Sequence, residues 1–328
     1  MITFVRMNSN VRYSIIVPVY NRPQEIEELL NSLTLQTYTN FEVLIVEDGS
    51  SITCEHVFEK FTGKLRIRYF FKPNSGPGPS RNFGFENAVG EYFVVFDSDC
   101  ILPPDYFNNV EQFLKETPLD AWGGPDRGHE NFSKLQKAMA FTMSSVFTTG
   151  GIRGGDKMLG SFQPRSFNMG ISKAVFQKTG GFKFDRYAED IELSIRINKS
   201  GFKSGYIAGA YVYHKRRTNF KQFFWQVYNF GRGRVLVNKE HRGAIKITHI
   251  FPSLFLLGLI CAFILIVFKP FLGFMLFTLY LVYFLIITIS AFLTIKSVGV
   301  SLLAGPSAFI QLIGYGWGFL SEILVKSR

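Results

Sequence analysis

Short apolar runs and helix-like segments alternate along the first two thirds of the chain. A β-branched run at Tyr13–Val19 predicts a strand, and apolar residues at helical spacing predict a helix that begins near Pro23, with Asn21 as a candidate cap. Further strands are predicted at residues 41–46, 65–71 and 92–96, and a β-like run covers residues 206–213. Strands that alternate with helices favour an α/β domain with a mostly parallel sheet covered on both faces.

Beyond residue 246 the pattern changes to long uncharged runs. Residues 251–268 and 271–295 carry no charge. At about 1.5 Å per helical residue, each run can cross a hydrocarbon core of roughly 30 Å. A third run, residues 298–325, is weaker because it contains a Gly-Pro pair, a glutamine and Glu322. We therefore expect two transmembrane helices and a third segment that either spans the membrane or re-enters it.

Charge divides the chain into three parts. The 328 residues contain 36 Lys and Arg against 25 Asp and Glu, a net charge of +11. Residues 1–214 are balanced, with 23 residues of each sign, whereas residues 215–246 hold nine basic residues and one acid. Together with the apolar pattern, this predicts a globular domain at residues 1–217, a basic amphipathic interfacial segment at 218–246 and a membrane domain at 247–328.

The basic segment sets the predicted orientation, because basic residues flank the cytoplasmic ends of membrane spans. We expect a multi-pass protein of the cell (inner) membrane with a cytoplasmic globular domain, and residues 1–10 lack the apolar core of a secretory signal. Membrane lipids are expected partners of the basic, aromatic-rich segment. The balanced charge of the globular domain argues against nucleic acid. Three scattered cysteines argue against a disulfide framework and against metal–thiolate chemistry.

Acidic residues follow two of the predicted strands. Asp48 follows the second strand, and Asp97 and Asp99 follow the fourth. Ligands of parallel sheets bind beyond the carboxyl ends of the strands, and alternate residues of an extended segment project to the same side. The last two carboxylates can therefore share Mg²⁺ or Mn²⁺, or one can hold a sugar hydroxyl, and such a cation predicts a phosphorylated substrate. A solvated turn residue is the alternative for each single aspartate.

Six ordered motifs now resemble a known family. The segments IIVPVYNRP, VEDGSS, GPGPSRNFG, FDSD, NMGISKAVFQKTGGF and AEDIELSIRI are similar, in order and spacing, to the family 2 glycosyltransferases of the GT-A fold. The resemblance covers residues 13–217. It implies a GT-A (nucleotide-diphospho-sugar transferase) domain, followed here by α-helical membrane segments. It also implies a nucleotide-diphosphate sugar donor, for which we expect a UDP-sugar, and an inverting transfer.

The resemblance assigns roles on the donor side by position. Pro18, Tyr20 and Asp48 stand where the family holds the nucleobase and ribose, and Asp48 can accept a hydrogen bond from the imide N–H of uracil. Arg81 stands where a basic residue approaches the diphosphate or supports that pocket. The alternative for Arg81 is a first-turn arginine of a helix capped by Ser80.

The same resemblance implies which residues bind the metal ion and which residue acts as the general base. Asp97 and Asp99 match the family's D-x-D pair, with Asp97 on the donor and Asp99 on Mg²⁺ or Mn²⁺, and His214 stands where some relatives place a metal or diphosphate ligand. A single inverting displacement needs a base for the acceptor proton. Glu189 and Asp190 match the family's E-D motif, so Asp190 is the candidate base and Glu189 an acceptor-side residue. Attraction of acids to a helix N-terminus is the alternative explanation for this pair.

Acceptor-side predictions are less constrained. Gly124 is expected to border the acceptor pocket, and Trp225 and Gln226 to contact the acceptor. Processive polymer synthases of the superfamily carry a Q-x-x-R-W motif, whereas residues 226–230 are QVYNF. We therefore expect non-processive transfer to a membrane-associated acceptor, such as a lipid-linked saccharide or polyprenyl phosphate. A processive polysaccharide synthase and a catalytically inactive membrane scaffold with a retained nucleotide-sugar fold are the alternatives.

Overall fold

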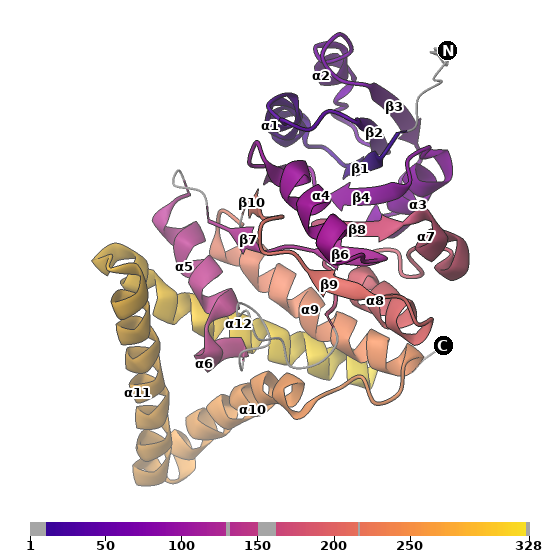
Figure 1. Cartoon of the computed structure of the whole chain (residues 1–328). Helices are drawn as coiled ribbons and strands as arrows, with labels where there is room; N and C mark the ends of the chain where they lie inside the picture. The colour runs from indigo at the N-terminus through magenta and orange to yellow at the C-terminus, as the bar shows by residue number, and fades with distance from the viewer. Residues whose placement is uncertain (1–10, 129–131, 150–161, 216, 326–328) are drawn as a thin grey trace. The chain divides into compact units, whose positions relative to one another are not determined.

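The computed structural model of the protein describes residues 11–128, 132–149, 162–215 and 217–325. The chain forms two compact units (Figure 1). The first comprises residues 1–127 and 161–214, and the second comprises residues 128–160 and 215–328. The functional boundaries expected at residues 217 and 246 stay predictions, and residues 1–10, which carry the signal-peptide argument, lie outside the described residues.

A seven-stranded sheet forms the centre of the first unit, in the order β3-β2-β1-β4-β8-β6-β9. Parallel pairing joins β3 to β2, β2 to β1, β1 to β4 and β6 to β9, whereas β8 is antiparallel to β4 and to β6. The strands are β1 (Tyr13–Val19), β2 (Phe41–Asp48), β3 (Ile67–Lys72), β4 (Tyr92–Phe96), β6 (Ala121–Gly123), β8 (Asn168–Ser172) and β9 (Ser204–Tyr206). The predicted mostly parallel sheet is confirmed.

A second, three-stranded sheet is built from β5 (Cys100–Ile101), β10 (Val212–His214) and β7 (Asp126–Arg127), in that order. The β-like run predicted at residues 206–213 is therefore divided, since β9 ends at Tyr206 and β10 begins at Val212 in the other sheet. The consequence for the site is that His214 pairs with Cys100 across antiparallel strands, next to Asp99.

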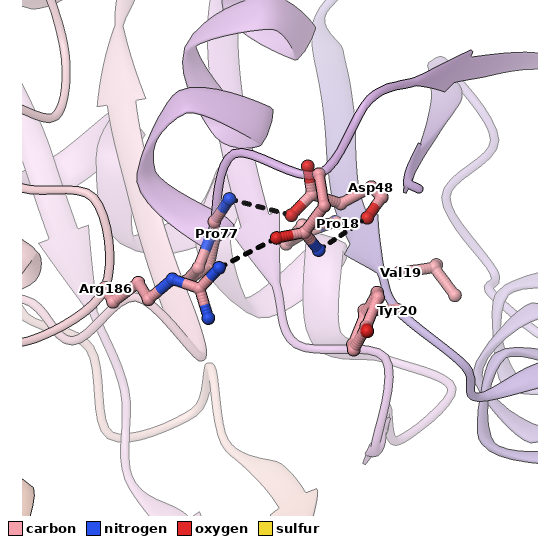
Figure 2. Close-up of a pocket in the computed structure, with 8 residues that line it drawn as sticks. Pro18, Val19, Tyr20, Asp48, Pro77 and Arg186 are labelled. Atoms are coloured by element: carbon pink, nitrogen blue, oxygen red, sulfur yellow. Dashed lines mark hydrogen bonds between the residues drawn. The ribbon is translucent and has the colours of Figure 1, made fainter. Parts of the chain in front are cut away.

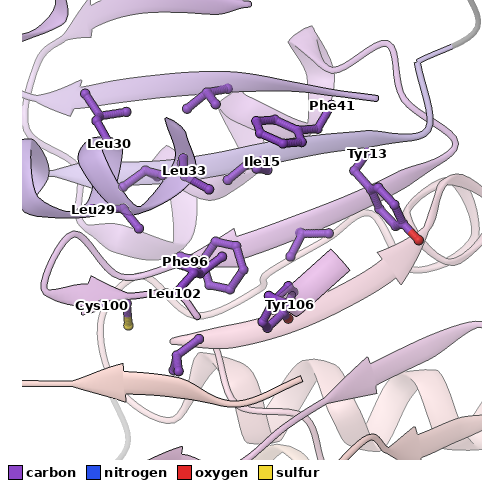
Figure 3. Close-up of a cluster of buried hydrophobic side chains, with 14 of the residues drawn as sticks. Tyr13, Ile15, Leu29, Leu30, Leu33, Phe41, Phe96, Cys100, Leu102 and Tyr106 are labelled. Carbon is purple, nitrogen blue, oxygen red and sulfur yellow. The ribbon is translucent and has the colours of Figure 1, made fainter. Parts of the chain in front are cut away.

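Helices cover both faces of the large sheet. They are α1 (Pro23–Thr34), α2 (Glu55–Glu59), α3 (Pro77–Asn87), α4 (Tyr106–Glu116), α7 (Lys173–Thr179) and α8 (Glu189–Lys199). Successive residues of β1 point into different cores: Ile15 packs with Leu29 of α1, and Ile16 packs with Leu193 of α8. Figure 3 shows the first of these cores, with α1 side chains facing the sheet. This alternation is what a strand buried on both sides requires.

The predicted cap at Asn21 is wrong, and the alternative for Arg81, a helix capped by Ser80, is wrong as well. Helix α1 does begin at Pro23, but Asn21 adopts a left-handed φ of 53° and its side chain accepts hydrogen bonds from the backbone N–H groups of Ser51 and Ile52, each at 2.9 Å. Helix α3 begins at Pro77, so Ser80 lies inside the helix and its hydroxyl bonds the Gly76 carbonyl oxygen at 2.8 Å. Proline favours the first helical turn and could have located this start.

The second unit is helical in its described part. It contains α5 (Lys134–Ser144), α6 (Val146–Thr149), α9 (Phe220–Glu240), α10 (Ile247–Phe268), α11 (Pro270–Ile295) and α12 (Val298–Leu324). The last three helices are long and apolar enough to cross a membrane. Each of the three apolar runs in the sequence therefore forms one continuous helix.

Candidate active site

A pocket opens at the carboxyl ends of β1 and β2 (Figure 2). These strands are parallel neighbours with Val19 beside Glu47, so the residues that follow each strand meet at one edge of the sheet. The lining residues are Pro18, Val19, Tyr20, Asp48, Asn74, Gly76, Pro77 and Arg186. The structure thus brings together the three residues assigned to the nucleobase and ribose, whose roles stay predictions.

The carboxylate of Asp48 is held by three hydrogen-bond donors. Lys72 Nζ lies 2.5 Å from Oδ1, the Ser75 N–H donates to Oδ1 at 2.9 Å, and the Gly76 N–H donates to Oδ2 at 2.8 Å. Burial alone would raise the pKa of Asp48, but these hydrogen bonds outweigh burial and lower that pKa below its ordinary value. Asp48 is therefore a fixed, charged acceptor.

Sequence reasoning missed three residues around this carboxylate. Lys72 is the last residue of β3, so the rule that selected Asp48 would have found it had the strand been predicted one residue longer. Arg186 donates to Asn74 Oδ1 at 2.7 Å, and Asn74 donates to the Asp48 carbonyl oxygen at 2.7 Å. Arg186 lies outside the helices and strands, and no local pattern indicates its position.

Arg81 joins the end of β4 to the start of α8. Its Nη2 donates to Asp97 Oδ1 and its Nη1 to Glu189 Oε1, both at 2.8 Å. The arginine is only 3% exposed. Burial raises the pKa of Glu189 to about 7, although the neighbouring guanidinium of Arg81 acts to lower that pKa. These contacts fit the expectation that Arg81 supports the pocket, because both terminal nitrogens are bonded to carboxylates.

Asp99 lies where three possible metal ligands meet. Its carboxylate, the His214 imidazole and the Cys100 thiol place ligand atoms within 4.8 Å of one another, and His214 Nε2 is 3.2 Å from Asp99 Oδ1. The sequence analysis predicted Asp99 and His214 but not the nearby thiol. Burial raises the pKa of the Cys100 thiol well above its usual value, and Sγ contacts the Phe167 carbonyl oxygen at 3.4 Å. A carboxylate and an imidazole suit a divalent ion such as Mn²⁺ better than a neutral thiol does.

Arg22 is a further residue of this cluster that the sequence did not indicate. Its Nη1 lies 2.7 Å from Asp99 Oδ2, and its side chain is 32% exposed. Arg22 follows β1 directly before α1, at the same sheet edge as the pocket. The contact joins residues 77 positions apart, which no local pattern could reveal.

The candidate base opens α8, as predicted. Asp190 is in the first turn; its Oδ1 accepts the Ile191 N–H at 2.7 Å, and its Oδ2 lies 3.6 Å from Arg165 Nη1. Its neighbour Glu189 turns instead toward Arg81 and the hydroxyl of Ser166. The two acids therefore have different partners, and Arg165 is another cation that the sequence analysis missed.

Of the acceptor-side candidates, Gly124 belongs to the first unit, and Trp225 and Gln226 belong to the second. Gly124 follows β6, where a Cβ would collide with the Ala210 carbonyl oxygen, so close backbone packing already accounts for this glycine. Trp225 and Gln226 lie on α9 of the second unit, and Trp225 is 51% exposed. The acceptor roles of all three stay predictions.

The first unit is thus an α/β domain with a mostly parallel sheet, and acids and an imidazole lie at its strand ends. The sequence model described as "Glycosyl transferase family 2" matches residues 14–179, half of the chain. The protein belongs to this family, as the motifs predicted.

Curated relatives match a limited region. An uncharacterized glycosyltransferase of Rickettsia felis is 38% identical over 107 residues, which cover 33% of this chain and 18% of that protein. The poly(ribitol-phosphate) beta-N-acetylglucosaminyltransferase TarS of Staphylococcus aureus is 38% identical over 125 residues, which cover 37% of this chain and 20% of TarS. The match thus spans a fifth or less of these two relatives.

Solved structures share the fold. The mannosyltransferase PcManGT from Pyrobaculum calidifontis, in complex with GDP-Man and Mn²⁺, aligns with a TM-score of 0.63 at 14% identity, covering 97% of this chain and 89% of that one. S. aureus TarS 1–349, in complex with UDP-GlcNAc, aligns with a TM-score of 0.51 at 22% identity, covering 74% and 70% of the two chains. The predicted GT-A fold is confirmed.

Proposed function

We propose that the protein is a membrane-anchored, metal-dependent inverting glycosyltransferase that moves one sugar from a UDP-sugar to a membrane-associated acceptor. The observation that carries the proposal is a network of contacts from the pocket to Glu189, the residue directly before the candidate base. Lys72 Nζ lies 2.5 Å from Asp48 Oδ1 and 3.3 Å from Ser80 Oγ. The next residue, Arg81, binds the carboxylates at the end of β4 and the start of α8. These contacts join the pocket to the start of α8, where the candidate base lies, and so support the proposal.

The pocket chemistry supports a nucleotide donor. Pro18 and Tyr20 offer apolar surface for a base, and Tyr20 is 53% exposed at the pocket edge. A carboxylate has about four acceptor positions. Asp48 uses three of them for Lys72 and two backbone N–H groups, so Oδ2 retains capacity for an imide N–H of uracil. The UDP-GlcNAc and GDP-Man complexes of the two neighbours also support a nucleotide-sugar donor.

Asp99 and His214 are the residues that would hold Mg²⁺ or Mn²⁺, while Asp97 holds the donor. The PcManGT structure with Mn²⁺ supports this assignment. The ion would supply neutralisation of the charge that develops on the diphosphate leaving group. On the protein side, Arg81 fixes Asp97 Oδ1 at 2.8 Å and so limits how far this carboxylate can move.

Asp190 is proposed as the general base. The acceptor oxygen attacks the anomeric carbon, the bond from that carbon to the diphosphate oxygen breaks, and the acceptor proton passes to the Asp190 carboxylate. One displacement inverts the configuration. The Asp190 Oδ1 bond to the Ile191 N–H fixes the carboxylate at the first turn of α8. Glu189 is then an acceptor-side residue that acts through Arg81.

The second unit supports a membrane-associated acceptor. Three apolar helices follow the basic α9, so an acceptor such as a polyprenyl phosphate or lipid-linked saccharide would be presented at the cytoplasmic face of the cell membrane. Trp225 and Gln226 of α9, with Gly124, remain our acceptor-side candidates. The QVYNF sequence at residues 226–230 favours single transfers over a processive synthase. An inactive scaffold would show no turnover.

The test uses the full chain purified in detergent. Radiolabelled UDP-glucose, UDP-GlcNAc and GDP-mannose are each offered with Mn²⁺, with Mg²⁺ or with EDTA, and released nucleotide is measured. We expect turnover of a UDP-sugar only with a divalent ion, and Asp190→Asn should lower kcat by about 10²–10⁴-fold while UDP binding is retained. Asp185→Asn, a nearby exposed aspartate, is the matched control.

The outcomes separate the parts of the proposal. Undiminished turnover of Asp190→Asn would place the base elsewhere, and full activity in EDTA would remove the metal. Absence of thermal stabilisation by UDP would contradict the donor assignment, because a ligand that binds the folded state must stabilise it. Long products from a single encounter would favour the processive alternative.

A further inference from the structure

Helix α12 packs along α9 at backbone contact distance within the second unit. At Gly231 of α9 a Cβ would collide with the Tyr315 carbonyl oxygen, and at Gly318 of α12 a Cβ would collide with the Tyr228 carbonyl oxygen. Gly314 lies against Val227. Residues later in α9 contact residues later in α12, so the C-terminal half of α12 runs parallel to α9. Small residues allow this approach.

A buried charge cluster closes the C-terminal end of this pair. Glu322 of α12 is 3% exposed and accepts hydrogen bonds from Arg232 Nε at 2.9 Å and Lys239 Nζ at 3.1 Å, both on α9. Charged groups are costly in the hydrocarbon core and concentrate in the headgroup layer. The C-terminal end of α12 is therefore tied to the basic helix.

The N-terminal end of α12 also meets a helix with charged residues. Gly299 lies against the side chain of Lys134 on α5, and Ala138 of α5 packs with Val300 and Ala304 of α12. Helix α5 begins with a polar turn, in which Ser133 and Gln136 form a capping box. Helix α12 has 27 residues, so its two ends are about 40 Å apart. Each end thus lies beside a helix that carries charged or polar side chains.

Helices α10 and α11 differ from α12. They meet near Gly273, where a Cβ would collide with the backbone of Ile266, and Lys269 is the single charged residue between residues 247 and 295. In the most apolar 18 residues of each helix, 22% are buried for α10 and 11% for α11, against 44% for α12. The first two helices therefore present their apolar surface outward, whereas much of α12 is covered.

We propose that α10 and α11 cross the membrane as a hairpin, and that α12 lies along the membrane surface with α5 and α9 without crossing it. The three helices then form an interfacial platform that faces lipid. Exposed apolar residues of α12, Leu302, Trp317 and Ile323, contact the lipid, and tryptophan is favoured at this depth. Figure 1 shows α12 alongside α9, with α11 leaving the N-terminal end of α12 at a steep angle. This inference concerns membrane contact and holds whichever sugar is transferred.

The proposal predicts the side on which four positions lie. In a Cys261→Ala background the two remaining cysteines, Cys54 and Cys100, are buried. Single cysteines are introduced by Arg242→Cys, Lys269→Cys, Val298→Cys and Leu324→Cys, one per protein. A membrane-impermeant maleimide is then applied to right-side-out and inside-out vesicles that contain the full chain, with detergent-solubilised samples as the measure of complete labelling.

We expect Arg242→Cys, Val298→Cys and Leu324→Cys to react from one side and Lys269→Cys from the other. Reaction of Val298→Cys and Leu324→Cys from opposite sides would show that α12 crosses the membrane and would overturn the proposal. Protection of both until detergent is added would place them in hydrocarbon and would contradict it equally. Reaction of Lys269→Cys from the same side as the others would remove the hairpin. None of these results depends on glycosyltransferase activity, so a failure here is distinct from a failure of the proposed reaction.

Discussion

Arg22 and Asp99 form an ion pair at the edge of the sheet, with 2.7 Å between Nη1 and Oδ2. The carboxylate of Asp99 is also our proposed metal ligand, and a guanidinium and a divalent cation cannot use the same oxygen at once. Burial and the neighbouring Asp99 act on Arg22 in opposite directions, and the net result raises the pKa of Arg22, so the arginine stays charged. The arginine and the ion should therefore compete for this side chain.

The first prediction concerns this competition. Arg22→Gln should bind Mn²⁺ more tightly in the absence of donor, by about 5–150-fold if the coupling is of ordinary size. Titration calorimetry of the purified chain with MnCl₂ measures the change. Lys60→Gln, which removes an exposed partner of Glu27, is the control and should leave Mn²⁺ binding unchanged. Weaker Mn²⁺ binding by Arg22→Gln would mean that the arginine organises the site instead.

The second prediction concerns Arg81 as a positioning residue. Arg81→Lys keeps the charge but cannot reach two carboxylates as the planar guanidinium does. Because Asp97 and the start of α8 are then no longer linked, kcat should fall by about 10²-fold, while the affinity for UDP, which depends on the Asp48 pocket, changes little. Steady-state kinetics and UDP titration separate the two effects.

Arg68→Lys provides the control for Arg81→Lys. Arg68 also binds a buried carboxylate, Glu42 at 2.8 Å, but away from the site. The Arg68→Lys variant should be less stable than the wild type but should show no specific loss of kcat. If both variants lose kcat equally, the effect is a general loss of folding and Arg81 has no particular role.

The third prediction follows from the lowered pKa of Asp48. A carboxyl group whose folded pKa lies below its unfolded value of 3.8 stabilises the fold above that value, and this contribution is lost as pH falls through the folded pKa. Asp48→Asn should therefore destabilise the protein at pH 7, by about 1–3 kcal/mol. The difference from the wild type should narrow below pH 4.

Thermal unfolding at several pH values measures this effect. Asp105→Asn serves as the control because Asp105 is exposed. A difference between Asp48→Asn and the wild type that stays constant from pH 7 to pH 3 would show that charge on Asp48 does not stabilise the fold.

Local patterns predicted the parts of the fold that rest on local physics. Strands β1, β2 and β4 are β-branched or aromatic runs, and because parallel strands end at a common edge, the pattern placed Asp48 at the edge where the pocket lies, whereas Tyr20 came from the family resemblance. The two-residue strands β5 and β7 were not predicted, since so few residues carry too little periodicity.

The cations of the site could not be predicted in the same way. Arg22, Arg165 and Arg186 find their partners across 77, 25 and 112 positions of sequence, and only the folded sheet brings them together. Motif resemblance supplied Asp190 and Arg81 because a family pattern records such long-range contacts indirectly. Where the pattern is silent, as for these three arginines, tertiary packing alone decides.

The fourth prediction tests the charge cluster of the interfacial platform. Glu322→Gln keeps the shape of the side chain but leaves Arg232 and Lys239 without the carboxylate that joins α12 to α9. Removing one member of a buried ion pair costs about 3–5 kcal/mol, and the partial exposure of the two cations lowers this figure. We therefore expect a lower unfolding temperature in detergent and faster proteolysis after α9.

The control for Glu322→Gln is Glu240→Gln, because Glu240 is an exposed acid at the end of α9, and this variant should have little effect on stability. Equal stability of Glu322→Gln and Glu240→Gln would mean that the glycine contacts alone hold α12 against α9.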